Sequence, residues 1–320
     1  MLENHYSSKS TKTLLQDKTT LAIITHANGI VSHDKGVLSS GLTSFENNVN
    51  EVWQVPNQIV ERGTTENCQW SKTQDLMFVS ILGDQSMLGI EQATEQAYSE
   101  LLRFSKHSGY DHLIRFWNYL PAINSGLGDD ENYKIFCAGR LKSFGSQDIN
   151  DHAFPSASAV GHLSQSQNSG IAICAIVSKH SGTHFSNSLQ TEAYQYPRQY
   201  GASSPSFARA TSINFSAKNT DSSGIFFISG TASIRGHETV HKGNLMGQLK
   251  TTHSNIEHLL EKAGRSMNSL KTMKVYVRHE SDLKAIQEKL TIDFPDVDKL
   301  FVQADICRDD LLVEIECFCI

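Results

Sequence analysis

The chain has 320 residues, 39% of them hydrophobic, which suffices for one large or two ordinary domains with a packed core. Its 34 acidic and 28 basic side chains give a net charge of −6, so it lacks the basic excess that nucleic-acid binding needs. Residues 1–20 lack the apolar core of a signal peptide, and no uncharged apolar run approaches membrane-spanning length, so we expect a cytoplasmic protein that binds neither nucleic acid nor membrane.

The first half of the chain predicts a strand, a helix and a strand. Residues 76–82 form an apolar run, residues 90–106 place apolar side chains on one helical face, and residues 112–120 alternate as a strand does. Residues 143–168 and 178–206 are rich in Ser, Gly, His and Gln, a composition typical of surface loops. Catalytic groups often sit on such loops, so these segments are candidates for a site.

The last hundred residues show the same alternation more clearly. They predict the order β, β, α, β, α, β, β, at residues 225–230, 231–234, 245–263, 270–277, 281–290, 300–305 and 311–318. Gly264 supplies the stop of the longer helix. We therefore predict an α+β protein built from two structurally repeated halves, residues 1–150 and 151–320, each a sheet with helices packed on one face.

Metal binding is not expected from the sequence. The six cysteines contain no C-x-x-C pair, and His237 and His241, although four residues apart, do not make a zinc-protease helix motif. In a cytosolic chain we expect these cysteines to be reduced and mostly buried.

Glu314 and Glu316 are the most informative pair of polar residues. Two carboxylates two residues apart on a strand project to the same face, away from the core that Val313 and Ile315 face. This pattern is typical of a solvated face. It also fits a strand that lines a cleft, where desolvation raises the pKa of a carboxyl group and makes it an acid near neutral pH.

Arginines and one cysteine are further candidates. Arg198, Arg209 and Arg235 lie in or beside the Gly- and Ser-rich segments, and guanidinium groups match carboxylates. An isolated arginine is normally only solvated, whereas three that converge would favour a small dianionic substrate. Cys307 precedes the last strand and has no His nearby in sequence to activate it, so we interpret it as a pocket wall rather than a nucleophile.

Residues 225–320 resemble the RidA-like (YjgF) superfamily. The motifs that carry the resemblance are Phe227-Ile-Ser-Gly, Glu257-His-Leu-Leu-Glu-Lys-Ala-Gly, Lys274-Val-Tyr-Val and Val313-Glu-Ile-Glu. In that superfamily the first glutamate of the closing motif points into the ligand cleft, which implies a functional role for Glu314.

A narrower resemblance, to the chorismatases, covers most of the chain. It rests on Tyr133-Lys-Ile-Phe-Cys-Ala-Gly-Arg, Phe154-Pro-Ser-Ala-Ser-Ala-Val-Gly, Ser204-Pro-Ser-Phe-Ala-Arg-Ala, Ile228-Ser-Gly-Thr-Ala-Ser-Ile, Gly236-His-Glu-Thr-Val-His and Ala304-Asp-Ile-Cys-Arg. The family implies two RidA-like halves in one chain, the first of them degenerate, and a chorismate pocket mainly in the second. It implies no metal and no cofactor.

This resemblance implies roles for particular residues. Glu314 would protonate the enolpyruvyl methylene of chorismate, so that pyruvate leaves. Arg209 would bind a substrate carboxylate, with Arg198, Tyr200 and Arg140 as further substrate-binding candidates. The segment around Arg198 is longer than the glycine-rich turn expected before Pro205, which leaves the role of that arginine open.

Product choice would depend on the pocket residues Ala232 and Cys307. Cys307 favours a hydroxybenzoate and Ala232 resembles the group that forms a cyclohexadiene diol; the interpretation adopted is 3- or 4-hydroxybenzoate. The alternatives are a chorismate hydrolase that gives the diol, a RidA-like imine deaminase that uses the same Glu314, and a non-catalytic module that binds a small ligand. The expected assembly is a monomer or a homotrimer.

Overall fold

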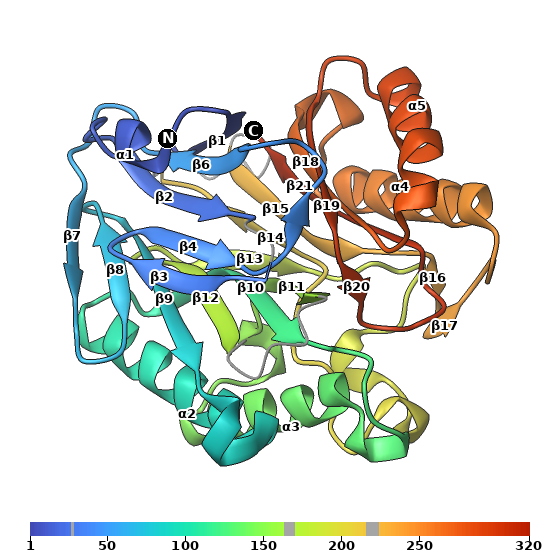
Figure 1. Ribbon diagram of the computed structural model, residues 1–320, viewed down its shortest axis with the longest axis horizontal. Coiled ribbons are helices and arrows are strands. Elements are labelled where there is room, and N and C mark those ends of the chain that lie inside the picture. The colour runs from blue at the N-terminus through green and yellow to red at the C-terminus, as the bar shows by residue number, and fades with distance from the viewer. Residues whose placement is uncertain (27–28, 163–169, 216–223) are drawn as a thin grey trace.

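The computed structural model of the chain describes residues 1–26, 29–162, 170–215 and 224–320. Within these residues the chain forms two seven-stranded sheets, one five-stranded sheet and a small two-stranded ribbon, with the long helices on the outside (Figure 1). The α+β class predicted from the sequence is confirmed. Two sheet halves with helices on one face are present, as predicted.

The second-half sheet contains the closing strand with the two glutamates. Its strands, in spatial order, are β13 (Gly182–Phe185), β14 (Ala210–Ile213), β15 (Ile225–Thr231), β21 (Val313–Cys319), β18 (Leu270–Val277), β19 (Asp298–Gln303) and β5 (Thr43–Ser44). Helices α4 (Leu245–Lys262) and α5 (Leu283–Asp293) cover its outer face. The α4 helix begins where the Asn244 side chain accepts a hydrogen bond from the Gly247 N–H, and it is followed by Gly264 at a φ of 67°, a left-handed conformation that glycine tolerates.

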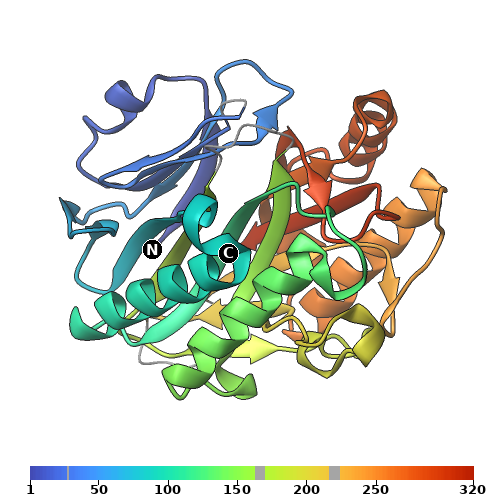
Figure 2. The same cartoon turned by 60° about the horizontal axis from the view of Figure 1, so that its bottom comes forward.

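The first-half sheet is built from the middle of the chain. Its strands, in spatial order, are β20 (Asp305–Ile306), β11 (Ser156–His162), β10 (His112–Pro121), β12 (Ile171–Ser178), β9 (Leu76–Gly83), β8 (Gln69–Lys72) and β7 (Glu61–Thr64). Helices α2 (Gln85–His107) and α3 (Asn132–Ser146) pack side by side on its outer face (Figure 2). Asp84 caps the start of α2 by accepting a hydrogen bond from the Ser86 N–H.

The two large sheets repeat one topology. Strands β9, β10, β11 and β12 correspond in order and direction to β15, β18, β19 and β21. In each half one pair is parallel, β10 with β11 and β18 with β19, and a helix connects the two strands. The faint resemblance between the two halves of the sequence therefore reflects a structural repeat.

The first 54 residues add a third sheet that the sequence analysis does not predict. Its strands, in spatial order, are β1 (Glu3–Ser7), β6 (Asn50–Gln54), β2 (Thr20–Thr25), β4 (Val37–Ser40) and β3 (Val31–Asp34), with the short helix α1 (Thr11–Leu14). Trp53 of β6 lies where the three sheets meet, with ring centroids 5.5 Å from Trp117, 5.7 Å from Phe227 and 5.2 Å from Phe318. The three sheets thus enclose one common interior.

Two features differ from the sequence predictions. The interpretation of residues 143–168 and 178–206 as surface loops is wrong for β11, whose backbone is buried in the first-half sheet, and for β13; residues 163–168 lie outside the described residues. Both β11 and β12 pair with β10, so strand pairing favours a boundary after β12 rather than at residue 150, and the division into two domains stays a prediction. In the described part of the chain, no helix is long and apolar enough to cross a membrane.

Candidate active site

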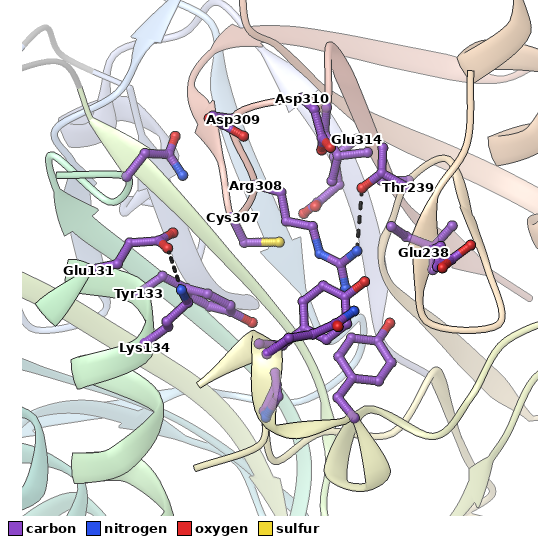
Figure 3. Close-up of a pocket in the computed structure, with 18 of the residues that line it drawn as sticks. Glu131, Tyr133, Lys134, Glu238, Thr239, Cys307, Arg308, Asp309, Asp310 and Glu314 are labelled. Atoms are coloured by element: carbon purple, nitrogen blue, oxygen red, sulfur yellow. Dashed lines mark hydrogen bonds and ion pairs between the residues drawn. The ribbon is translucent and has the colours of Figure 1, made fainter. Parts of the chain in front are cut away.

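A cavity of about 670 Å³ opens between the two halves. One wall comes from the second half: Gly230 and Glu314 of the sheet, the ribbon of β16 (Ile234–Arg235) and β17 (Glu238–Thr239), and residues 307–311. The opposite wall is Tyr133 and Lys134 of α3 (Figure 3). Residues 190–209 line the cavity as well, through side chains that include Gln190, Tyr196, Tyr200 and Arg209.

A strand that changes sheets brings the two walls together. After β19 the chain leaves the second-half sheet, and β20 pairs with β11, with Ile306 opposite Val160. Cys307 and Arg308 follow directly, so they lie at the junction of the halves before the chain returns to the second-half sheet as β21.

Alternation along β21 decides where the two glutamates point. Val313 and Ile315 belong to the outer core under α4 and α5, and Glu314 and Glu316 face the other way. They are 4% and 6% exposed, so the solvated-face alternative is wrong and the cleft alternative agrees with the structure. Glu314 lines the cavity and Glu316 lies deeper, in the interior between the sheets.

Gly230 makes room for the Glu314 carboxyl group. A Cβ atom added at this glycine would overlap Glu314 Oε1 and lie 2.7 Å from Glu314 Cδ. The requirement here is close approach rather than backbone conformation. Gly230, the penultimate residue of β15, therefore allows the Glu314 carboxyl group of the neighbouring strand to approach the backbone closely.

The environments of the two glutamates separate their pKa values. Burial, together with the negative charge of Glu316, raises the pKa of Glu314 from 4.5 to about 8, against the opposing effects of Arg115, Arg278 and Arg209. Burial also acts to raise the pKa of Glu316, but Lys274 and Arg115 outweigh it and lower that pKa to about 2. At neutral pH Glu314 is a neutral acid and Glu316 is a carboxylate, the arrangement that acid catalysis needs.

The first half lacks an equivalent acid. In β21, Glu314 pairs with Tyr276 and Glu316 pairs with Lys274. At the corresponding places of β12, Ala172 pairs with Tyr119 and Cys174 pairs with Trp117. The two halves therefore share the strand scaffold, and the two carboxyl groups lie in the second half.

Arg209 lies in the cavity with one donor free. Its Nη2 donates to the Thr191 carbonyl at 2.7 Å and to the Tyr196 hydroxyl at 2.9 Å, which fixes the side chain. Its buried Nε has no hydrogen-bond partner within the described residues. A buried donor without a partner is costly, and this one borders the cavity, so it is available to an acceptor on a ligand.

Arg308 is a second cation of the cavity, and the sequence analysis missed it. Its Nη1 donates to the His237 carbonyl at 2.9 Å and to Thr239 Oγ1 at 3.3 Å. Its guanidinium lies 4.1 Å from the ring centroid of Tyr200. The Cys-Arg dipeptide between two predicted strands was the signal that could have identified it.

Three other predicted residues line the cavity, and two do not. Tyr200, Ala232 and Cys307 are part of its wall. Arg198 lies outside the cavity, with a side chain that is 66% exposed and donates to both Asp129 carboxylate oxygens at 2.8 and 2.5 Å. Arg140 is buried in α3 with its guanidinium 5.0 Å from the ring centroid of Phe136, and it does not line the cavity either.

Cys307 is a thiol rather than a nucleophile in this environment. Burial, with a contribution from Glu314, raises its pKa to about 12. Its side chain packs against Ala232, Ile234 and Leu311. The interpretation of Cys307 as a pocket wall thus agrees with the structure.

Two residues of α3 complete the site and were not predicted as site residues. Tyr133 packs over Phe136, and Lys134 donates to the Gly128 carbonyl at 2.8 Å and pairs with Glu131 at 3.1 Å.

In the part of the chain that the structure describes, no group of three His, Cys, Asp or Glu side chains is arranged to hold a metal ion.

Comparison with known proteins places this site in a family. Residues 51–176 match the family described as "Chorismatase FkbO/Hyg5-like, N-terminal", and residues 207–320 match "Endoribonuclease L-PSP". A 3-hydroxybenzoate synthase of Streptomyces hygroscopicus is 36% identical over 237 residues, which cover 70% of this chain and 68% of that protein. This chain belongs to the chorismatase family.

Other relatives of this chorismatase agree with the assignment. A chorismatase of Streptomyces rapamycinicus is 30% identical, with 94% of this chain and 92% of that protein covered. A crystal structure of a chorismatase superimposes with a TM-score of 0.84 at 25% identity and covers 100% of this chain. The resemblances predicted from the sequence, to the chorismatases over most of the chain and to RidA-like proteins in the second half, are confirmed, and the chain is an enzyme of this family.

Proposed function

We propose that this enzyme converts chorismate into pyruvate and a hydroxybenzoate, with Glu314 as the acid. The observation that carries the proposal is a carboxyl group with a pKa of about 8 in a cavity that also holds the guanidinium groups of Arg209 and Arg308. Chorismate carries two carboxylates and an enol ether that protonation activates. The names of the relatives, chorismatase and 3-hydroxybenzoate synthase, support the same substrate.

In the first step Glu314 transfers its proton to the methylene carbon of the enolpyruvyl group. The electron pair of the C=C bond forms the new C–H bond, and the adjacent carbon becomes an oxocarbenium ion. Glu314 is then a carboxylate and stabilises that positive charge. On the diol route, water attacks the cation and returns a proton to Glu314, and cleavage of the bond between this carbon and the ring oxygen releases pyruvate. On the hydroxybenzoate route, the bond between the ring carbon and the ether oxygen breaks instead. The ether oxygen then becomes the ketone oxygen of pyruvate, and the ring returns a proton to Glu314 as it becomes aromatic.

The two products differ in their use of water. A hydroxybenzoate and pyruvic acid together have the composition of chorismic acid, so this route needs no net water. The cyclohexadiene diol route adds one water molecule to the products. A cavity that shields the oxocarbenium ion from bulk water therefore favours the aromatic product.

Arg209 and Arg308 are the residues that we assign to substrate carboxylates. Arg209 has the unpaired Nε described above, and Arg308 is held by two oxygen acceptors and by Tyr200. Two separated guanidinium groups match the two carboxylates of chorismate. Tyr200 contributes by positioning Arg308.

We further propose that Cys307 and Ala232 control the choice of product, with Cys307 favouring a hydroxybenzoate. Both residues line the cavity, and they pack against each other beside Glu314. The relative that is 36% identical is named a 3-hydroxybenzoate synthase, which favours the 3-isomer. Substituting either residue is expected to change the ratio of diol to hydroxybenzoate, with pyruvate release retained.

Incubation of the purified, EDTA-treated enzyme with chorismate tests the proposal. Pyruvate is followed by a coupled assay and ring products by chromatography. We expect pyruvate with a hydroxybenzoate from the wild type, and a loss of about 100- to 10,000-fold in kcat for Glu314→Gln with binding of chorismate retained. Pyruvate with a diol would overturn the product assignment alone. Absence of pyruvate would refute the substrate, and full activity of Glu314→Gln would refute the role of the acid.

A further inference from the structure

Glu316, the second glutamate of β21, is held by more donors than a structural carboxylate needs. It is 6% exposed and lies in the interior where the three sheets meet. The donors to its two oxygens are Arg115 Nη2 at 2.6 Å, Ser158 Oγ at 2.6 Å, Trp117 Nε1 at 2.8 Å, Lys274 Nζ at 2.8 Å and Tyr276 Oη at 3.0 Å. The two cations among these donors, Lys274 and Arg115, outweigh the effect of burial and lower the pKa of Glu316 to about 2, so it is a carboxylate at neutral pH.

The charge of Glu316 is balanced within a closed network. Lys274 also donates to Glu51 at 2.7 Å, so two cations face two carboxylates. Such buried ion groups rarely stabilise a protein more than apolar residues of the same size. A network with this cost is explained better by a function than by stability.

Contacts connect this network to Glu314. Ser158 Oγ, which donates to Glu316, accepts a hydrogen bond from the Gly230 N–H at 3.0 Å. Gly230 in turn lies directly against the Glu314 carboxyl group. The two glutamates share one face of one strand, so the charge of Glu316 acts on Glu314 through a buried interior of low dielectric.

We propose that Glu316 is a positioning residue for the reaction: its fixed negative charge, held between Arg115 and Lys274, keeps Glu314 in the protonated form that donates to substrate. This inference rests on the proposed function of Glu314. It assigns the acid chemistry of the site to two carboxyl groups with opposite protonation, of which Glu314 alone touches substrate.

Groups from several elements face Glu314. Arg115 of β10, Arg278 after β18 and Arg209 before β14 favour its ionised form, and the neutral Cys307 thiol borders it from the loop after β20. Glu316 of β21 opposes these three guanidinium groups. Without the charge of Glu316, burial alone would raise the pKa of Glu314 against the effect of the three cations.

The pH dependence of kcat/KM tests the inference with Glu316→Gln. In the wild type, kcat/KM is expected to fall tenfold per pH unit above about pH 8, where Glu314 ionises. In Glu316→Gln this alkaline limb should move at least about one pH unit lower, because the like charge is removed and Arg115 is left unpaired. Activity should recover toward the wild-type value at acidic pH. An equal loss at every pH would show a merely structural role and overturn the inference.

Two further variants keep the test decisive. Arg115→Gln removes a cation that favours ionised Glu314. The alkaline limb of its kcat/KM profile should therefore move to higher pH, opposite to the shift in Glu316→Gln. This variant also tests the inference if Glu316→Gln fails to fold. The double variant Glu51→Gln/Lys274→Gln removes one charge of each sign from the network and leaves Glu316 with Arg115. The alkaline limb of the double variant should stay at the pH of the wild type. A shift to lower pH equal to that of Glu316→Gln would overturn the inference.

The outcomes separate this inference from the proposed function. An active Glu314→Gln enzyme would refute the proposed function itself. An inactive Glu314→Gln enzyme, combined with an unmoved limb in Glu316→Gln and in Arg115→Gln, would refute the role of Glu316 alone.

Discussion

The raised pKa of Glu314 predicts that this acid makes the folded enzyme less stable as pH increases. In the unfolded chain the carboxyl group ionises near 4.5, and in the folded enzyme near 8, so the folded state binds the extra proton between these values. Stability therefore falls as pH rises through this window, by about 1.4 kcal/mol per pH unit. Over the whole window the loss is (8 − 4.5) × 1.36, or about 5 kcal/mol.

Glu314→Gln removes this dependence, because the amide has the shape of the neutral acid and does not ionise. Relative to the wild type, the variant should gain little free energy of unfolding below pH 4.5 and about 5 kcal/mol above pH 8. Urea unfolding at several pH values, followed by tryptophan fluorescence, measures the difference from the midpoints of the two proteins.

The difference between the two unfolding curves decides the matter. Glu257→Gln, on the exposed side of α4, removes the same formal charge and reports the effect of net charge alone. If wild type and Glu314→Gln respond to pH in parallel, the carboxyl group is ionised in the folded enzyme at neutral pH and the reasoning from burial is wrong. If the variant loses stability relative to the wild type as pH rises, the predicted direction of the pH effect is wrong as well.

Three other substitutions have defined outcomes. Gly230→Ala pushes a Cβ atom into the Glu314 carboxyl group. It should lower kcat/KM about 100-fold in the steady-state assay, because displacement of a reacting group by an ångström has this effect. Activity within a few fold of wild type would show that the acid tolerates the shift. Arg209→Gln should raise KM for chorismate about 10- to 100-fold with kcat less affected, and an unchanged KM would remove this residue from the binding site. Arg198→Gln and Asp129→Asn should change KM alike and by less than about fivefold, because the exposed pair contributes little; a much larger effect of Arg198→Gln than of Asp129→Asn would place that arginine on the substrate after all.

The sequence reveals the strand that contains the proposed acid because the information is local. The alternation of Val313 and Ile315 with Glu314 and Glu316 predicts which side chains share a face. The alternation does not predict whether the polar face contacts water or another sheet. The resemblance to RidA-like proteins supplied that information.

Residues that enter the cavity from distant parts of the chain were harder to predict. Tyr133 and Arg308 meet at the cavity only because β20 joins the other half's sheet, and no local pattern encodes that crossing. Arg198 and Arg209 look equivalent in a Ser- and Gly-rich segment. The structure directs Arg198 to Asp129 at the surface and Arg209 inward to Tyr196.

Strand β11 shows that a serine-rich segment can form a buried strand. Its serines are typical of loops, yet they are buried with their hydrogen bonds satisfied inside the fold. Ser156 Oγ donates to the Ile114 carbonyl at 2.9 Å, and Ser158 Oγ donates to Glu316 at 2.6 Å. A hydroxyl group that finds an acceptor costs little to bury, so serine content alone does not exclude a core strand.

The repeated topology gives the enzyme a freedom that a symmetric assembly of identical subunits lacks. Identical subunits share one sequence, so a substitution that improves a wall in one subunit changes every subunit of the assembly. Here the two sheets are encoded separately. The helix with Tyr133 and Lys134 is therefore able to change to suit a substrate while the strand with Glu314 stays as it is.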